Sequence, residues 1–240
     1  KKKNNKGIKS LILECHQLNK NYLPDAWPSH ELRKFLDRMA KEKITMSSIH
    51  LKYAEVGEFN FSQVLDKDSY LTLEIEPTNS GILRGLSTTL DTKVLKSVRF
   101  ALNYTPYYNE SAANDVPTIS KCYESIENAN LKRLSIIGAI SMPERTLRAI
   151  SGNEHLEYLS LGPNNIPFED LAKYLSKTKL KQASITINPS TIDIENLRDW
   201  LPQLNPQLET LNIIYNADIH LDGAFNNMES SHIKHLSIKS

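Results

Sequence analysis

The chain has 240 residues, of which 40% are hydrophobic and 24% are charged, so it can bury a sizeable core and is not a disordered protein. Lysine and arginine together number 29 against 28 acidic residues, and a formal charge of +1 gives no reason to expect a general nucleic-acid or membrane-surface binder. The presence of only 8 glycines and 2 cysteines argues against a glycine-loop nucleotide enzyme and against a disulfide-stapled secreted module.

The N-terminal segment is basic, with four lysines among its first six residues. Only a short apolar run follows before the first acidic residue, so we expect residues 1–7 to form a solvated basic tail, with a weak nuclear address as the alternative to a plain tail. No apolar stretch approaches the ~20 residues that a membrane-spanning helix needs. Cys15 and Cys122 stand far apart among apolar neighbours, which predicts reduced core residues in an intracellular protein, cytoplasmic or nuclear.

One pattern recurs along the chain: an apolar residue, two free positions, an apolar residue, one free position and a third apolar residue. Successive copies mostly start 24 to 28 residues apart, and two longer intervals of 38 and 36 residues are interpreted as insertions. Such a period predicts short parallel strands that stack one after another. The copies are Ile8-Leu11-Leu13, Met46-Ile49-Leu51, Tyr70-Leu73-Ile75, Leu95-Val98-Phe100, Leu131-Leu134-Ile136, Leu156-Leu159-Leu161, Leu180-Ala183-Ile185, Leu208-Leu211-Ile213 and Ile233-Leu236-Ile238.

Asparagine stands eight residues after the first apolar position in four of these copies, as Asn103, Asn164, Asn188 and Asn216. A buried asparagine at such a turn can donate to carbonyls of one coil and accept from the backbone of the next. Asparagine is also common in loops, but its fixed offset from the apolar pattern favours a structural ladder of buried side chains.

The segments between the expected strands have the apolar spacing of helices. In the first of them, Ser29 is a candidate helix cap, followed by Leu32, Phe35, Leu36 and Met39 on one stripe. The other stripes are Leu83, Leu86 and Leu90; Ile119, Cys122 and Ile126 after Pro117 near a helix start; Phe168, Leu171 and Leu175; and Leu197, Trp200 and Leu201 before Pro202 ends the helix.

These residues resemble the leucine-rich repeat family, whose signature is LxxLxLxxN. The best copy is Leu156-Glu-Tyr-Leu159-Ser-Leu161-Gly-Pro-Asn164. With helices between the strands, the resemblance is to the α/β, ribonuclease-inhibitor-like type. It implies a curved α/β solenoid of about nine repeats over residues 8–240, with a parallel β-sheet on the concave face and helices on the convex face. Neither end of the repeats shows a polar cap, so we expect the domain to be part of a longer protein or to contact something at its ends.

Motifs for catalysis and ligand binding are missing from the sequence. It contains neither a glycine-rich phosphate loop nor cysteine spacing for zinc. A cysteine nucleophile needs a histidine base, and His16 follows Cys15 directly, but neighbours on a strand point to opposite faces. We therefore expect a protein that is not an enzyme and that has no cofactor and no metal site.

The side chains between the inward-pointing residues of each strand should lie on the concave face. Arginine and tyrosine are enriched in binding hot spots, so this face is a candidate partner-binding surface, and a generic hydrophilic sheet is the alternative. Its charged and aromatic members are Lys52, Glu74, Glu76, Arg99, Arg133 and Tyr158, above a floor of small residues that includes Ser135, Ser160, Ser184 and Ser237. The 36-residue interval adds Tyr104, Tyr107 and Tyr108, which either recognise a partner or cover neighbouring helices.

Taken together, these features predict a protein-recognition scaffold that binds another protein, without membrane insertion and without nucleic acid. Within the family it resembles the substrate receptor of an F-box type ubiquitin ligase adaptor, although no F-box is present, or a bacterial effector that would act in the host cytoplasm. The alternative is a regulator of a small GTPase, or the recognition part of a ligase enzyme whose catalytic domain lies elsewhere.

Overall fold

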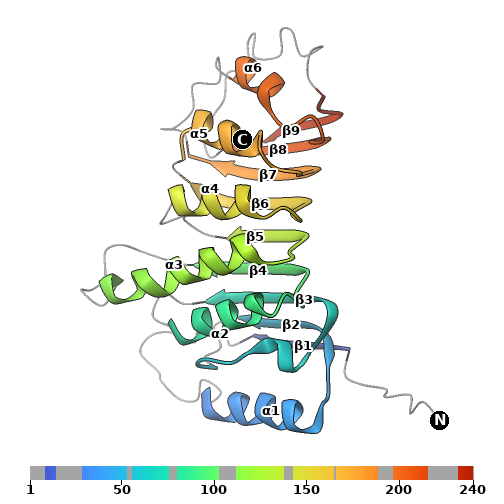
Figure 1. Ribbon diagram of the computed structural model, residues 1–240, viewed down its shortest axis with the longest axis vertical. Helices are drawn as coiled ribbons and strands as arrows, with labels where there is room; N and C mark the ends of the chain where they lie inside the picture. Colours follow the sequence, from blue (N-terminus) through green and yellow to red (C-terminus); the bar gives the residue numbers. More distant parts are fainter. Residues whose placement is uncertain are drawn as a thin grey trace, which may run out of the picture. The chain divides into compact units, whose positions relative to one another are not determined.

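The chain is α/β, and parallel strands alternate with helices along it (Figure 1). It divides into two compact units, Lys1–Ser125 and Ile126–Ser240. The computed structural model describes residues 9–14, 29–52, 56–75, 80–102, 112–137, 143–164, 166–188, 197–215 and 232–239.

In the first unit, β1 pairs with β2, β2 with β3 and β3 with β4, all in parallel. Its elements are β1 (Ser10–Glu14), α1 (Ser29–Glu42), β2 (Met46–Lys52), the short 3₁₀ helix η1 (Phe61–Gln63), β3 (Leu65–Ile75), α2 (Ser80–Asp91), β4 (Ser97–Leu102) and most of α3 (Ala112–Asn128).

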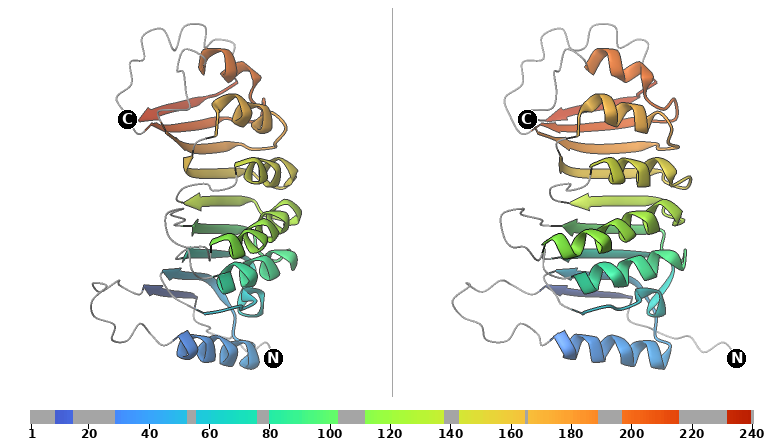
Figure 2. Two further views of the ribbon diagram at one scale, coloured as in Figure 1. Left: turned by 90° about the vertical axis from the view of Figure 1, so that its left-hand side faces the viewer. Right: turned by 60° about the vertical axis from the view of Figure 1, so that its left-hand side comes forward.

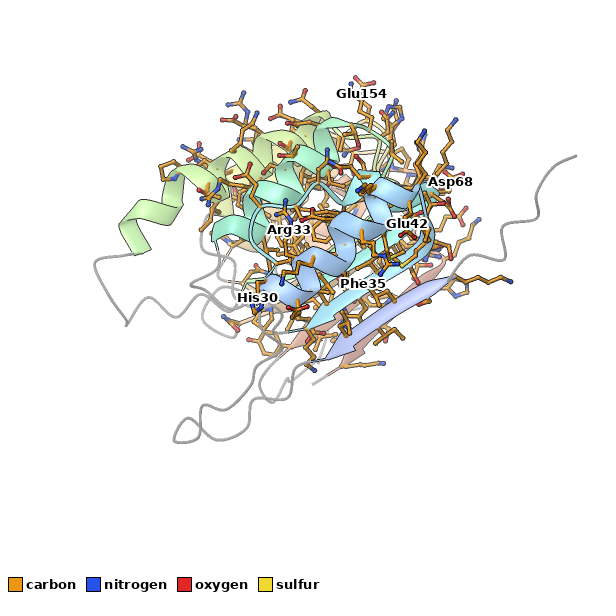
Figure 3. The ribbon with its side chains drawn as sticks, turned by 90° about the horizontal axis from the view of Figure 1, so that it is seen from below. His30, Arg33, Phe35, Glu42, Asp68 and Glu154 are labelled. Atoms are coloured by element: carbon orange, nitrogen blue, oxygen red, sulfur yellow. The ribbon has the colours of Figure 1, made fainter. Side chains whose placement is uncertain are left out.

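The helices of the first unit lie on one face of its strands (Figures 2 and 3). Strand alternation sends every second side chain into this helix-covered layer, where Leu51 and Phe100 are each 1% exposed. We call the other side of the strands the open face of the first unit. Its described side chains are Ser10, Ile12, Ser48, His50, Lys52, Tyr70, Thr72, Glu74, Ser97 and Arg99.

The predicted helices α1 and α2 are confirmed, with one difference in α1. Leu36 and Leu86 are fully buried in the apolar stripes expected for them. Phe35 was expected on the buried stripe of α1, but its side chain is 38% exposed (Figure 3). The buried stripe runs through Leu32, Leu36 and Met39, at spacings of four and three residues, and Phe35 lies at the margin of that arc.

The register of β3 differs from the prediction, which placed Tyr70 in the core as the first apolar residue of its copy. Instead Leu71 and Leu73 pair with Ile49 and Leu51 of β2 and are buried, whereas Tyr70 lies on the open face and is 52% exposed. Apolar residues stand at 71, 73 and 75, so the repeat pattern fits the sequence equally well when it is shifted by two positions. The predicted register of β3 is therefore wrong by two residues.

A bulge in β3 explains why the spacing of the repeat pattern is lost in the sequence of this strand. Five positions separate Leu65 from Tyr70 on β3, while two separate their partners Met46 and Ser48 on β2, so β3 has three additional residues. Asp68, within this bulge, has a φ of 67°. Leu65 is the buried apolar residue that occupies the place assigned to Tyr70.

The segment 56–64 packs tightly on α2 and α1. A Cβ added at Gly85 of α2 would lie 2.4 Å from the Phe59 carbonyl oxygen, so only glycine allows this approach. The Phe61 N–H donates to Thr89 Oγ1 at 2.9 Å, and the Arg33 guanidinium lies 5.1 Å from the Phe59 ring centroid. These contacts fasten the segment to both helices.

In the second unit, β5 pairs with β6, β6 with β7, β7 with β8 and β8 with β9, again in parallel. The elements are β5 (Arg133–Ile137), α4 (Pro143–Gly152), β6 (Tyr158–Asn164), α5 (Phe168–Leu175), β7 (Gln182–Ile187), α6 (Leu197–Trp200), the 3₁₀ helix η4 (Leu201–Gln203), β8 (Thr210–Tyr215) and β9 (His235–Lys239).

The helices of the second unit also gather on one face of its strands (Figure 2). Inward side chains such as Leu159 and Ile185 are fully buried. The uncovered side is the open face of the second unit, formed by Arg133, Ser135, Ile137, Tyr158, Ser160, Gly162, Gln182, Ser184, Thr186, Thr210, Asn212, Ile214, His235, Ser237 and Lys239.

The remaining helix predictions were met unevenly. α6 ends at Trp200, directly before the η4 turn that contains Pro202, as expected. Pro117 was expected near the start of α3, but the helix already begins at Ala112 and Pro117 lies inside it. Alanine is the strongest helix former, and residues 112 and 113 are both alanine, which favours the additional N-terminal turn. Helix α4 was not predicted.

Candidate functional site

In-register pairing places the open-face side chains of the first unit in rows that cross its strands. One row consists of Ser10, Ser48, Tyr70 and Ser97, and the next of Ile12, His50, Thr72 and Arg99. Two large apolar side chains stand out on this face, because Ile12 is 64% exposed and Tyr70 is 52% exposed. Arg99, a predicted binding residue, is exposed on β4 beside Thr72.

Lys52 and Glu74, both predicted as binding residues, are brought together by the register of β2 and β3. Lys52 Nζ lies 3.3 Å from Glu74 Oε2, and His50 Nε2 lies 3.8 Å from Glu74 Oε1. His50 Nε2 is shielded from solvent and has no hydrogen-bond partner within the described residues. The three side chains form a compact cluster of both charge signs, suited to pairing with polar groups of a partner.

The hydrogen bonds around this cluster do not form a nucleophile–base pair. Ser48, one row away from His50, donates from its Oγ to Ser10 Oγ at 2.8 Å. Across the described residues no group of three or more His, Cys, Asp or Glu side chains is arranged to hold a metal ion.

Arg133 and Tyr158 are the predicted binding residues on the open face of the second unit, and the structure places them together. They are register partners on β5 and β6, and the Arg133 guanidinium carbon lies 5.6 Å from the Tyr158 ring centroid. An exposed cation–π contact of this kind contributes about 0.5–1 kcal/mol and restrains both side chains. Arg133 keeps its charge exposed while the ring restrains its position.

Beside this pair runs a row of small polar side chains. Register pairing aligns one from each strand, from β5 to β9, and all are partly exposed: Ser135, Ser160, Ser184, Asn212 and Ser237. Their low side-chain volume leaves the backbone of the sheet accessible to another chain.

A ladder of alternating charge, which we did not predict, precedes the strands of the second unit. Lys181 Nζ lies 3.1 Å from Glu157 Oε2, Lys132 Nζ lies 3.8 Å from Glu157 Oε1, and Lys234 Nζ lies 2.7 Å from Glu209 Oε1. Each residue directly precedes a strand, so the sequence signal was an alternation of sign at the second position of successive repeat copies.

The pairing of this ladder shifts the acidity of its carboxyl groups. The hydrogen bond from Lys181, together with its charge, lowers the pKa of Glu157 below its ordinary value. Lys234 lowers the pKa of Glu209 in the same way. Both carboxylates are therefore held ionised and neutralised at the edge of the open face.

Asn164, one of the four predicted ladder residues, is 2% exposed at the end of β6. Its Nδ2 donates to the carbonyl oxygens of Gly162 at 3.2 Å and Thr186 at 2.8 Å, and its Oδ1 accepts from the Ile166 N–H at 3.1 Å. Asn188 is half-buried, and its N–H donates to the Asn164 carbonyl oxygen at 3.3 Å. The Asn164 amide thus joins β6 to β7.

Two buried asparagines that we did not predict make similar contacts before the N-terminal ends of β6 and β8. Asn153 Nδ2 donates to the Ile126 carbonyl oxygen at 2.7 Å, and Asn205 Nδ2 donates to the Leu180 carbonyl oxygen at 2.9 Å. Each Oδ1 also accepts from the backbone N–H two residues later. Each asparagine stands three residues before the first apolar residue of a repeat copy, a spacing visible in the sequence.

Several predicted residues lie outside the described part of the chain. These are the basic tail 1–7, Cys15, Glu76, the insertion tyrosines Tyr104, Tyr107 and Tyr108, and the ladder positions Asn103 and Asn216.

Cys122 is a free thiol in the core, as predicted, and is 3% exposed. Burial raises its pKa to about 12, which keeps it protonated and unreactive at neutral pH. None of the helices in the described ranges has the length and apolarity needed to cross a bilayer.

Comparison with known proteins adds no relative, because no family model and no curated protein matches the chain. Inferences about function therefore depend on the sequence pattern and on the geometry of the two open faces.

Proposed function

We propose that the chain is a leucine-rich repeat solenoid that acts as a protein-recognition scaffold and binds its partner through the open faces of its strands. In this proposal the open faces form the concave side, and the protein serves as a receptor for another protein, in the manner of a ligase adaptor or an effector.

The observation that carries the proposal is the in-register pair of Arg133 and Tyr158 beside a floor of small polar residues. Side chains on paired strands lose little conformational freedom on binding, so their contacts contribute efficiently to affinity. The first unit adds exposed Ile12 on β1, Tyr70 on β3 and Arg99 on β4, a combination of apolar, aromatic and arginine side chains typical of binding hot spots.

The proposal is tested by affinity capture and mass spectrometry with the full chain, followed by measurement of the captured partner's affinity. Arg133→Glu combined with Tyr158→Ala should weaken the partner by about 3 kcal/mol or more, roughly a 150-fold change in Kd, with an unchanged circular dichroism spectrum. The matched control is Lys177→Glu combined with Tyr174→Ala. That pair has a similar cation–π contact of 5.8 Å next to α5, outside the open face, and its loss should leave affinity unchanged.

The competing site is the insertion with Tyr104, Tyr107 and Tyr108. Normal binding by the Arg133 and Tyr158 double variant, together with lost binding after deletion of residues 104–108, would assign recognition to the insertion and refute the open-face proposal.

A further inference from the structure

We infer that the open face of the second unit binds an acidic protein segment in an extended conformation that runs across strands β5 to β9. This inference rests on the proposed function and names the chemistry of the partner. It follows from the distribution of charge, from free hydrogen-bond donors and from the spacing of the cations.

Charge on the second unit is segregated. Residues 126–240 contain 13 acidic and 11 basic side chains, so the unit as a whole is slightly acidic. Its open face nevertheless has no carboxylate among the described residues, while Arg133 and Lys239 are exposed on it and His235 lies beside β8. Apart from Glu209 of the charge ladder, the exposed acids among the described residues of this unit lie on its helices or the turns beside them: Glu144, Glu154, Glu169, Asp170 and Asp199.

The charge ladder at the edge of this face also has a net positive charge. Glu157 and Glu209 are its only acids, and both are paired with lysines. Lys132, Lys181 and Lys234 outnumber them by one, so the edge does not offset the positive charge of Arg133 and Lys239. An acidic segment on this face meets Arg133 at β5 and Lys239 at β9 and no described carboxylate between them, whereas a basic segment is repelled by both cations.

The floor of the face offers donors to carboxylates. Within the described residues, no hydrogen bond occupies the side chains of Ser135, Ser160, Ser184, Asn212 and Ser237. Each can therefore donate to a carboxylate oxygen or to a backbone carbonyl of a bound segment. A hydrogen bond to a charged acceptor is stronger than one between neutral groups, which favours an acidic partner over a neutral one.

The spacing of the cations sets the length of the segment. Arg133 is on β5 and Lys239 is on β9, four strand steps away and four residues farther along the strand direction. At ~4.8 Å per strand and ~3.3 Å per residue they are about 23 Å apart on a diagonal across the sheet. An extended chain covers this distance in about seven residues. Side chains of alternate residues then face the floor, so an alternation of acidic and small residues matches the surface.

The test uses the full chain and three fluorescent probes: a peptide of alternating Glu and Ser of about ten residues, its Lys and Ser counterpart of the same length, and a single-stranded oligothymidylate of similar length. Binding is measured by fluorescence anisotropy at low and at physiological salt. Variants are Arg133→Glu, Lys239→Glu and Ser160→Trp, which fills the middle of the floor, and the control is Lys177→Glu.

The inference predicts that the acidic peptide binds and that salt weakens it. Arg133→Glu and Ser160→Trp should each raise its Kd by about tenfold or more, whereas Lys177→Glu should leave it unchanged. Absence of binding of the acidic peptide, or binding that is indifferent to Ser160→Trp, would overturn the inference.

Two other outcomes separate this inference from the proposed function. Tighter binding of the basic peptide, with sensitivity to Ser160→Trp, would retain protein recognition at this face and overturn the charge assignment. Tighter binding of the oligothymidylate, lost in Arg133→Glu, would overturn both, because the occupant would then be a nucleic acid.

Discussion

Replacement of Asn164 by alanine tests whether a single buried amide holds two strands of the second unit together. The change leaves the Ile166 N–H and the Thr186 carbonyl oxygen without their partner, and the Ile166 N–H is buried. An unsatisfied buried backbone group costs about 1–3 kcal/mol, and a partly buried one costs less, so we expect a loss of about 3 kcal/mol. With a urea m-value of about 1–3 kcal/mol/M, the unfolding midpoint should fall by at least about 1 M.

The assay is urea unfolding followed by the fluorescence of Trp200, in a Trp27→Phe background so that the signal comes from the second unit alone. Hydrogen exchange of the Ile166 amide provides a local readout, since this N–H loses its acceptor in the variant. The matched control is Asn212→Ala, an asparagine on the open face, which should change stability by less than about 0.5 kcal/mol. An equally small change for Asn164→Ala, with the Ile166 amide still protected, would refute the reasoning.

Three further predictions concern packing, charge and a buried thiol. Gly85→Ala should lower the melting temperature of the first unit by several degrees, because a Cβ there meets the main chain of segment 56–64, whereas Thr88→Ala on the exposed side of the same helix should change it little. Glu157→Lys should destabilise the second unit more than Glu157→Gln, and high salt should reduce the difference. The native pairing lowers the pKa of the Glu157 carboxyl, so its contribution to stability should be lost as the pH falls through that lowered pKa. Burial raises the pKa of Cys122 to about 12, so above about pH 9 the folded state keeps a proton that the unfolded state releases. The free energy of unfolding should therefore fall by about 1.4 kcal/mol per pH unit from about pH 9 upward, and the fall should be shallower in Cys122→Ala.

The parallel strands and most helices could be predicted because their apolar spacing is fixed by burial on one side. Leu36 and Leu86 illustrate this, since both lie on stripes with helical period and both are fully buried. Helix α4 was missed because its buried face has few large apolar residues: Leu147 and Ile150 are accompanied there by Thr146 and Ala149.

The register of β3 could not be read from the pattern. A bulge adds residues that no periodicity reveals, and a strand with apolar residues at every second position fits two frames equally well. This difference affects the candidate site, because Tyr70 was predicted in the core and instead lies on the open face. The contact of Arg133 with Tyr158 also depends on the register of two strands that are distant in sequence.

Other features of the site were present in the sequence but were not recognised. The alternating charges at the second position of each copy in the second unit, and Asn153 and Asn205 at a fixed offset before the strands, follow from the repeat itself. Their partners lie one repeat away, so their role becomes apparent only when consecutive copies are aligned as neighbouring strands.

The most direct measurement of the central claim is a titration of isotope-labelled full chain with the peptide of alternating Glu and Ser, followed by amide chemical shifts. We expect the largest shifts at Ser135, Ser160 and Ser184, on the floor of the open face of the second unit, and little change along α4 and α5. Shifts confined to those helices, with the amides of the floor unchanged, would contradict the assignment of the open face as the binding surface.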